Sequence, residues 1–142
     1  MGSGISILCK NCRYEKSFML GIGMMYSSLE NVIDLVHYAR RKKILDILQN
    51  HKVIIGEYRW GNPFYEHRLY RCLSCNQLYE RFYVKIKYDD HKLYETKFKC
   101  SKCQNELKAV DDVVDDEENI KKYPCPECNK RGFSIQEVVM WD

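Results

Sequence analysis

The chain has 142 residues, of which 45% are hydrophobic and 30% are charged, and its formal net charge is +3. This length supports one domain or two very small ones, and it excludes a large multidomain enzyme. The composition is that of a folded globular protein and excludes collagen-like, mucin-like and disordered chains. Cysteine is the exception, because eight cysteines are too many for incidental core thiols in a chain of this length.

The first element in the chain is a C-x-x-C motif, and the same spacing recurs three times. The four pairs account for every cysteine: Cys9/Cys12, Cys72/Cys75, Cys100/Cys103 and Cys125/Cys128. Each pair can wrap a tight turn with both thiolates on one side, and four thiolates complete a closed structural zinc site. The cysteines therefore predict two zinc ions with no ligand left over. Iron uses the same ligand type, whereas a thioredoxin-like redox pair needs a βαβ setting that none of these motifs has.

Free thiols of this kind are typical of a reducing compartment. The first residues carry no basic segment of a secretory signal, and glycines interrupt the first apolar stretch, Phe18 to Tyr26. No apolar run approaches the roughly 20 residues that span a bilayer. We therefore expect a cytoplasmic protein with no membrane segment.

One helix is predicted after the first motif, over about residues 28–49. Ser27 and Glu30 form a capping box, and apolar residues follow at helical spacing. Four basic residues interrupt the apolar stripe for a full turn: Arg40, Arg41, Lys42 and Lys43. They fit a solvated helix face, a bend between two helices or a phosphate-binding patch, and the solvated face is the simplest of the three. We interpret His37 and His51 as ordinary polar residues, because the cysteines already fill two metal sites.

Strands are predicted next, at 52–60 and 64–71. A hairpin follows, with strands at 79–88 and 93–99, in which apolar and polar residues alternate. The apolar residues of the two strands lie on the same face only if the numbers of paired residues add to an even number. This requires a loop of three or five residues. We favour three residues, Asp89 to His91, with His91 in the left-handed conformation.

This register places most of the cations of the hairpin on one exposed face together with two tyrosines. The face consists of Tyr79, Arg81, Tyr83, Lys85, Lys87, Lys97 and Lys99, with Glu95 as its only acid. Positive charge interleaved with aromatic rings suits a nucleic-acid backbone and stacked bases. A solvated sheet face is the simpler interpretation, because Lys and Tyr are common there.

The last third of the chain contains two motifs, an acidic loop at 111–118 and a closing strand at about 133–141. The simplest interpretation of the acidic loop is a solubilising segment. The segments around the two motifs, Phe98 to Gln104 and Tyr123 to Lys130, resemble the two knuckles of a zinc ribbon. The opening of the chain up to Cys12 is also similar to small bacterial zinc-ribbon proteins of uncharacterised function, a resemblance that implies no activity.

Sequence order favours one zinc site from the first two motifs and a second site from the last two. The expected fold class is α+β, with zinc-ribbon-type antiparallel β hairpins, two four-cysteine zinc sites and one inserted helix. The corresponding halves are residues 1–90 and 91–142, packed as one unit. The long insertion between the first two motifs departs from a simple ribbon, so a nested pairing of Cys72/Cys75 with Cys100/Cys103 stays open.

The expected function is that of a non-catalytic binding or regulatory module. The resemblance implies nucleic acid or a nucleoprotein machine as the partner, because ribbons recur in transcription, translation and DNA-processing proteins. The alternative is a protein–protein adapter or inhibitor that docks through the acidic loop or an aromatic surface. We expect neither an enzyme nor a small-molecule substrate, because catalytic zinc needs an open position and the chain has no P-loop, H-E-x-x-H or G-x-S-x-G motif.

Overall fold

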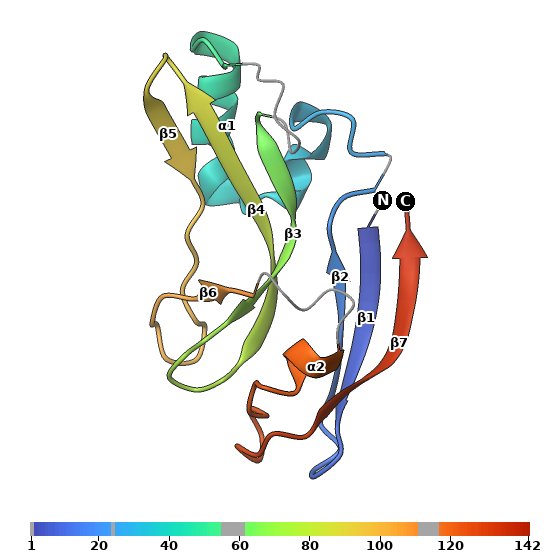
Figure 1. Ribbon diagram of the computed structural model, residues 1–142. Coiled ribbons are helices and arrows are strands. Elements are labelled where there is room, and N and C mark those ends of the chain that lie inside the picture. The colour runs from blue at the N-terminus through green and yellow to red at the C-terminus, as the bar shows by residue number, and fades with distance from the viewer. Residues whose placement is uncertain (1, 24, 55–61, 111–116) are drawn as a thin grey trace. The chain divides into compact units, whose positions relative to one another are not determined.

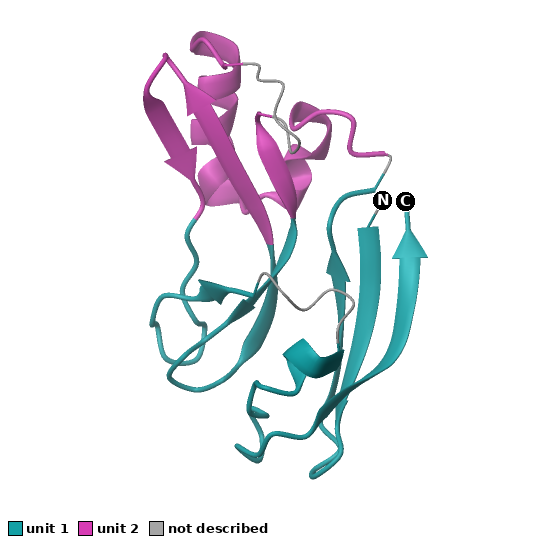
Figure 2. Ribbon diagram, in the orientation of Figure 1, with its two compact units in different colours: residues 1–23, 67–81, 97–142 teal, residues 24–66, 82–96 magenta. Residues whose placement is uncertain are grey.

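The computed structural model describes residues 2–23, 25–54, 62–110 and 117–142, which form an α+β chain with antiparallel sheets (Figure 1). The chain divides into two compact units (Figure 2). Unit 1 comprises Met1–Gly23, His67–Arg81 and Lys97–Asp142, and unit 2 comprises Met24–Glu66 and Phe82–Thr96. This division differs from the expected halves at 1–90 and 91–142, because long-range strand pairing joins the two ends of the chain within unit 1.

Unit 1 contains a three-stranded antiparallel sheet in the order β2-β1-β7. The strands are β1 (Gly2–Cys9), β2 (Glu15–Leu20) and β7 (Phe133–Trp141). Alternate residues face the core, so Ile5, Ile7 and Phe18 are buried. The predicted closing strand at 133–141 is confirmed as β7, which lies beside β1 along its length (Figure 1).

Two further strands, β3 (Phe64–Arg71) and β4 (Leu78–Tyr88), run through both units. The predicted strand at 64–71 is therefore confirmed as β3. In unit 1 the end of β3 pairs with the short β6 (Lys108–Ala109), and the one-turn helix α2 (Glu117–Ile120) contributes the buried Ile120. All four C-x-x-C motifs belong to unit 1.

Unit 2 has its own apolar core between helical segments and a hairpin. It contains the 3-10 helix η1 (Glu30–Leu35), the helix α1 (Tyr38–Asn50), and β5 (Lys92–Glu95), which pairs with β4. The core includes Val36, Ile44 and Ile47 from the helical segments and Val84 and Ile86 from β4. No helix in the described ranges is long and apolar enough to cross a membrane.

The prediction of one continuous helix over 28–49 is wrong, because the backbone is extended at Val36 and non-helical at His37, between η1 and α1. The His37 imidazole accepts a hydrogen bond from the Ala39 N–H at 3.3 Å and so caps α1. The Arg41 guanidinium donates to the Val36 carbonyl at 2.8 Å and to the Asp34 carbonyl at 2.9 Å, which satisfies the end of η1. The bend therefore lies before the basic run at 40–43, and α1 continues through that run.

The predicted three-residue loop of the hairpin is confirmed, because Tyr88 pairs with Lys92. The left-handed residues are Asp89 and Asp90, with φ of 48° and 67°, and not His91. The Asp89 carboxylate accepts hydrogen bonds from His51 Nδ1 at 2.6 Å and from the Lys52 N–H at 3.1 Å, contacts that hold this conformation. His51 thus has a polar structural role.

The second strand of the hairpin ends earlier than predicted, at Glu95 instead of Lys99. The next residue, Thr96, is buried, and its hydroxyl accepts the Val84 N–H at 3.0 Å. The Thr96 N–H still donates to the Val84 carbonyl at 3.0 Å, but the Val84 N–H bonds to a side chain instead of a backbone carbonyl, and the regular ladder stops.

Two predictions fall partly outside the described residues. Of the predicted strand at 52–60, residues 52–54 are described, and Val53 bridges to Tyr88. Of the acidic loop, Glu117 and Glu118 are described, and they begin α2 as exposed residues.

Candidate metal centres

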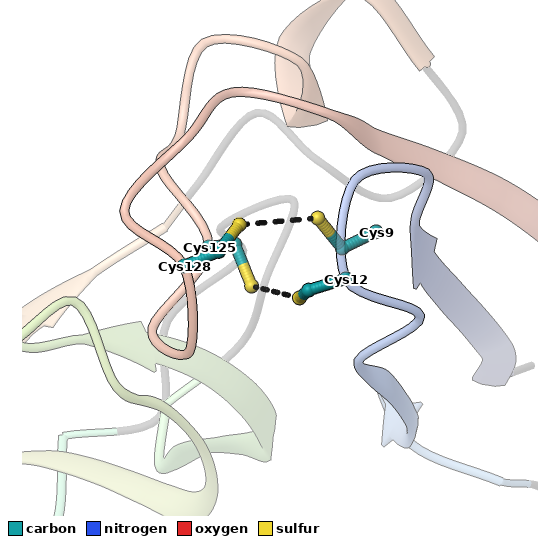
Figure 3. Close-up of side chains that lie close together, drawn as sticks. All are labelled: Cys9, Cys12, Cys125 and Cys128. Atoms are coloured by element: carbon teal, nitrogen blue, oxygen red, sulfur yellow. Dashed lines mark hydrogen bonds between the residues drawn. The ribbon is translucent and has the colours of Figure 1, made fainter.

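The eight cysteines form two groups of four, each of which could hold a metal ion. Site 1 consists of Cys9, Cys12, Cys125 and Cys128 (Figure 3). Site 2 consists of Cys72, Cys75, Cys100 and Cys103. In each group the sulfur atoms lie within 4.8 Å of one another, and all eight thiols are free of disulfides. Every predicted ligand residue is thus part of a quartet.

The pairing favoured by sequence order is wrong, and the nested pairing is correct. Strand β1 ends at Cys9, which lies opposite Phe133 in β7, so the first and last motifs meet at one end of this sheet. The two middle motifs meet because β3 leads into Cys72 and pairs with β6, while Lys99 bridges to Glu106. Long-range strand pairing therefore decides which motifs share a site.

The sulfur separations fit a tetrahedral metal site. In site 1 they are 3.7 Å for Cys9/Cys128 and 3.5 Å for Cys12/Cys125 (Figure 3). In site 2 they are 3.2 Å for Cys72/Cys103, 3.5 Å for Cys75/Cys100 and 3.9 Å for Cys75/Cys103. Four thiolates about 2.3 Å from a zinc ion form a tetrahedron with edges of about 3.8 Å, whereas a disulfide bond is about 2.0 Å long. These side chains therefore fit a closed four-thiolate site.

All four motifs fold into the same backbone turn. The N–H of the first cysteine bonds to the carbonyl five residues on, and its carbonyl accepts the N–H four residues on, at 2.8 to 2.9 Å in every motif. The residue after the second cysteine is always left-handed: Arg13, Asn76, Gln104 and Asn129, with φ between 60° and 65°. The turn aims backbone N–H groups at the first sulfur, as those of Asn11 and Cys12 do toward Cys9.

Burial and these N–H groups pull the thiol pKa values apart. Burial raises the pKa of Cys100, but the Tyr79 hydroxyl and the N–H groups of Cys103 and Lys102 outweigh it and lower that pKa to about 6. Burial raises the pKa of Cys75 to about 12, with the neighbouring sulfurs adding to the effect. Site 1 shows the same contrast, with pKa values of about 7 for Cys9 and about 12 for Cys125. Four thiolates therefore coexist in a site only when a cation neutralises them.

The predicted basic face of the hairpin is only partly present. Tyr79 lies at site 2, with its hydroxyl 3.2 Å from Cys100 Sγ and the Arg81 guanidinium 4.8 Å from its ring centre. Tyr83 is only 6% exposed, and its hydroxyl donates to the Glu95 carboxylate. The prediction of two exposed stacking tyrosines is therefore wrong. Among the predicted cations of this face, Arg81 and Lys85 are half-buried, and Lys87, Lys97 and Lys99 are exposed.

The basic run in α1 divides in a similar way. Arg41 satisfies the carbonyls at the bend, and Arg40 is half-buried. Lys42 and Lys43 are exposed, as the simpler interpretation of a solvated helix face predicts.

A cluster of positive charge that the sequence reasoning missed lies in the turns of site 1. We call it the site 1 basic cluster, and it consists of Lys10, Arg13, Lys130 and Arg131, all exposed. Within the described part of the chain, none of these four side chains has a hydrogen bond or an ion pair. The signal was present in the sequence, because two of the cations lie within or next to the first motif and two follow the fourth.

An asparagine pair connects a turn of site 2 with a turn of site 1. Asn76 Nδ2 donates to Asn129 Oδ1 at 3.3 Å, and Arg71 donates to Asn76 Oδ1 at 2.8 Å. The Arg71 guanidinium also lies 5.1 Å from the ring centre of Tyr123, just before the last motif. The left-handed residues of two turns therefore also hold these turns together.

No protein-family model, no curated protein and no solved structure matches this chain. Its fold and sites define it as an α+β chain with two four-cysteine groups that could hold metal ions, compatible with zinc-ribbon-like sites.

Proposed function

We propose that the chain is a non-catalytic zinc-binding module of the zinc-ribbon type, with one zinc ion in each site. The ligand sets carry this proposal, because each site gathers four cysteine sulfurs at the spacing of a zinc tetrathiolate. Catalytic zinc instead keeps an open position and usually takes His or carboxylate ligands. Metal analysis of the purified chain tests the proposal: two zinc ions per chain are expected, and a smaller number or iron would contradict it.

The proposed partner of the module is nucleic acid, contacted through the site 1 basic cluster. Lys and Arg supply most of the affinity for phosphate groups. The two turns that carry the cluster are joined by a hydrogen bond from the Lys10 N–H to the Gly132 carbonyl at 2.9 Å. Among the residues of these two turns, 9–14 and 125–132, Glu127 is the one acid beside the four cations. Exposed and unpaired cations on two adjoining turns suit a phosphate backbone.

The net charge of the zinc-loaded chain does not itself attract nucleic acid. Each zinc tetrathiolate carries a formal charge of −2, so two loaded sites change the chain's +3 to a net charge of −1. The affinity must then come from the local cluster and not from the field of the whole molecule. With four phosphate contacts at most, log K should fall with log salt with a slope no steeper than about −3 to −4.

Fluorescence anisotropy with single-stranded DNA, double-stranded DNA and RNA over a salt series tests this contact. The double variant Lys10→Glu with Lys130→Glu should weaken binding at least tenfold at low salt and flatten the salt slope by about 1.5. The matched control, Lys121→Glu with Lys122→Glu, reverses the same charge at another exposed pair of unit 1. Absence of binding at low salt, or equal losses in both variants, would end the nucleic-acid proposal.

A protein adapter is the second candidate function, and one observation favours it. Three consecutive apolar residues of the edge strand β7 are exposed: Val138 at 47%, Val139 at 49% and Met140 at 57%. Exposed apolar edge strands recur at protein–protein contacts. Affinity purification from the native host should lose its partners when Val138 and Met140 are both replaced by Lys. Unchanged recovery would contradict docking through β7.

A further inference from the structure

The two candidate centres differ in how their sulfur atoms are shielded, and site 2 is the better protected. The Tyr79 hydroxyl lies 3.2 Å from Cys100 Sγ, and Asn105 Nδ2 donates to Cys103 Sγ at 3.4 Å. Asn105 is held in place by Ser74, whose hydroxyl oxygen lies 2.8 Å from Nδ2. A hydrogen bond withdraws electron density from a thiolate, so these sulfurs react more slowly with an oxidant.

Site 1 has no comparable side-chain shield. Over the described residues, no side-chain N–H or O–H other than the thiols themselves donates to its sulfurs. Backbone N–H groups reach sulfurs in both sites, that of Tyr14 toward Cys12 and that of Gln77 toward Cys75, so they do not distinguish the two sites. Cys12 is also exposed, whereas every cysteine of site 2 is buried or half-buried. In a loaded site all four sulfurs are thiolates, so exposure and hydrogen bonding decide which one an oxidant reaches.

We propose that Cys12 is the oxidation-sensitive ligand of this protein, and that peroxide releases the metal of site 1 while site 2 keeps its own. This inference rests on the proposed function, in which both sites hold zinc. Its chemical basis is the combination of an exposed thiolate and a second sulfur close enough to resolve it, because Cys12 Sγ lies 3.5 Å from Cys125 Sγ (Figure 3).

The reaction takes two balanced steps. The Cys12 thiolate attacks a peroxide oxygen, an S–O bond forms, the O–O bond breaks, and the departing hydroxide takes up a proton to become water. The Cys125 thiolate then attacks the Cys12 sulfur, an S–S bond forms, and the sulfenic hydroxide leaves and is protonated to a second water. Two electrons have passed from the sulfur pair to peroxide. Only Cys9 and Cys128 remain as thiolates, too few to retain the metal.

The disulfide would join the same two segments that a shared metal joins. Cys12 belongs to the turn between β1 and β2, and Cys125 lies before β7, which pairs with β1 along most of its length. The oxidised chain should therefore stay folded, and a thiol reductant should restore the site.

Zinc release from the loaded full chain under limiting hydrogen peroxide, followed with a chromophoric zinc indicator, tests this inference. We expect one zinc ion per chain in a fast phase, a second at least tenfold more slowly, and a Cys12–Cys125 disulfide in peptide maps of the fast-phase product. Two ions released at one rate, or a first disulfide within site 2, would overturn the inference and leave the proposed function intact. Fewer than two zinc ions before oxidation would overturn both.

Two conservative variants test the reason for the difference. Tyr79→Phe removes the hydroxyl beside Cys100, so the slow phase should become several-fold faster while the fast phase is unchanged. Tyr14→Phe is the matched control, because among the described residues the Tyr14 hydroxyl has no hydrogen bond, and it should alter neither phase. An unchanged slow phase in Tyr79→Phe would show that hydrogen bonding does not protect site 2.

Discussion

Gln104 occupies a backbone position that favours glycine. It follows the second cysteine of its motif with a φ of 65°, as do its three counterparts at 60° to 64°. A left-handed conformation costs an ordinary L-residue about 1–2 kcal/mol, whereas glycine adopts it without a steric penalty. Glycine also loses more conformational freedom on folding, which cancels about 0.5–1 kcal/mol of this advantage.

Gln104→Gly should therefore stabilise the folded chain by about 0.5–1 kcal/mol. The side chain contributes little that would be lost, because its one hydrogen bond in the described structure is an exposed contact of 3.4 Å with the Ser101 carbonyl. For a chain of this size the gain corresponds to a rise in Tm of about 1–4 °C.

Asn76→Gly is the matched control at the equivalent position of another motif. Asparagine tolerates the left-handed region, and the Asn76 side chain bonds both to Arg71 and to Asn129. Its replacement should thus lower the free energy of unfolding by about 1 kcal/mol. Thermal unfolding of the metal-loaded variants at a fixed free metal concentration measures both. A lower Tm for Gln104→Gly than for the parent chain would refute the argument that the left-handed backbone of Gln104 costs stability.

Two further predictions concern single side chains. An added Cβ at Gly132 would lie 2.3 Å from Asn11 Nδ2 but 3.6 Å, an ordinary contact distance, from Cys9 Sγ. The exposed Asn11 amide can turn away, so Gly132→Ala should change the metal affinity of site 1 by less than about twofold in a chelator competition, and a larger loss would contradict this. Hydrogen bonds from His51 and the Lys52 N–H lower the pKa of Asp89 below its ordinary 3.8, so its carboxylate stabilises the hairpin above that value and the effect is lost as the pH falls below it. Asp89→Asn should thus be less stable than the parent at pH 6, with the difference shrinking below pH 3.8; a constant difference would contradict this.

The members of the two cysteine quartets could be predicted from the sequence as candidate metal ligands, but their pairing could not. A C-x-x-C turn closes through hydrogen bonds within six residues, so its spacing is a local signal. Which turns meet depends instead on β1 pairing with β7 across nearly the whole chain. Sequence order is no guide to such a contact, because the cost of closing a longer loop rises only slowly with its length.

The hairpin and the helix show the same limit. Alternation along β4 fixed the register and the loop length, because a one-residue shift would turn Val84 and Ile86 out of the core. The left-handed residues of the loop were missed, since His51 and Lys52 select Asp89 from far away in the chain. The bend at His37 likewise depends on carbonyl contacts made by Arg41, a residue for which the sequence pattern favoured a solvated helix face over a bend between two helices.

The position of each candidate metal site in the chain predicts how far the structural effect of losing that site should extend. Site 2 includes the turn between β3 and β4, since Cys72 follows β3 and Leu78 begins β4 shortly after Cys75. Strand β4 continues into unit 2, where it supplies Val84 and Ile86 to the core. Site 1 joins the β1–β2 turn to the segment before β7, and all of these residues belong to unit 1.

Cys75→Ser with Cys103→Ser should therefore reduce the hydrogen-exchange protection of the Val84 amide, which bonds to the buried Thr96 hydroxyl in unit 2. We expect a loss of at least tenfold, because the strand that holds this amide is no longer anchored by a closed turn. Cys12→Ser with Cys128→Ser removes the same number of ligands from site 1 and should change this amide by less than about twofold. If both double variants reduce its protection equally, strand continuity does not carry the effect of site 2 into unit 2, and the two sites do not differ in the structural role assigned to them.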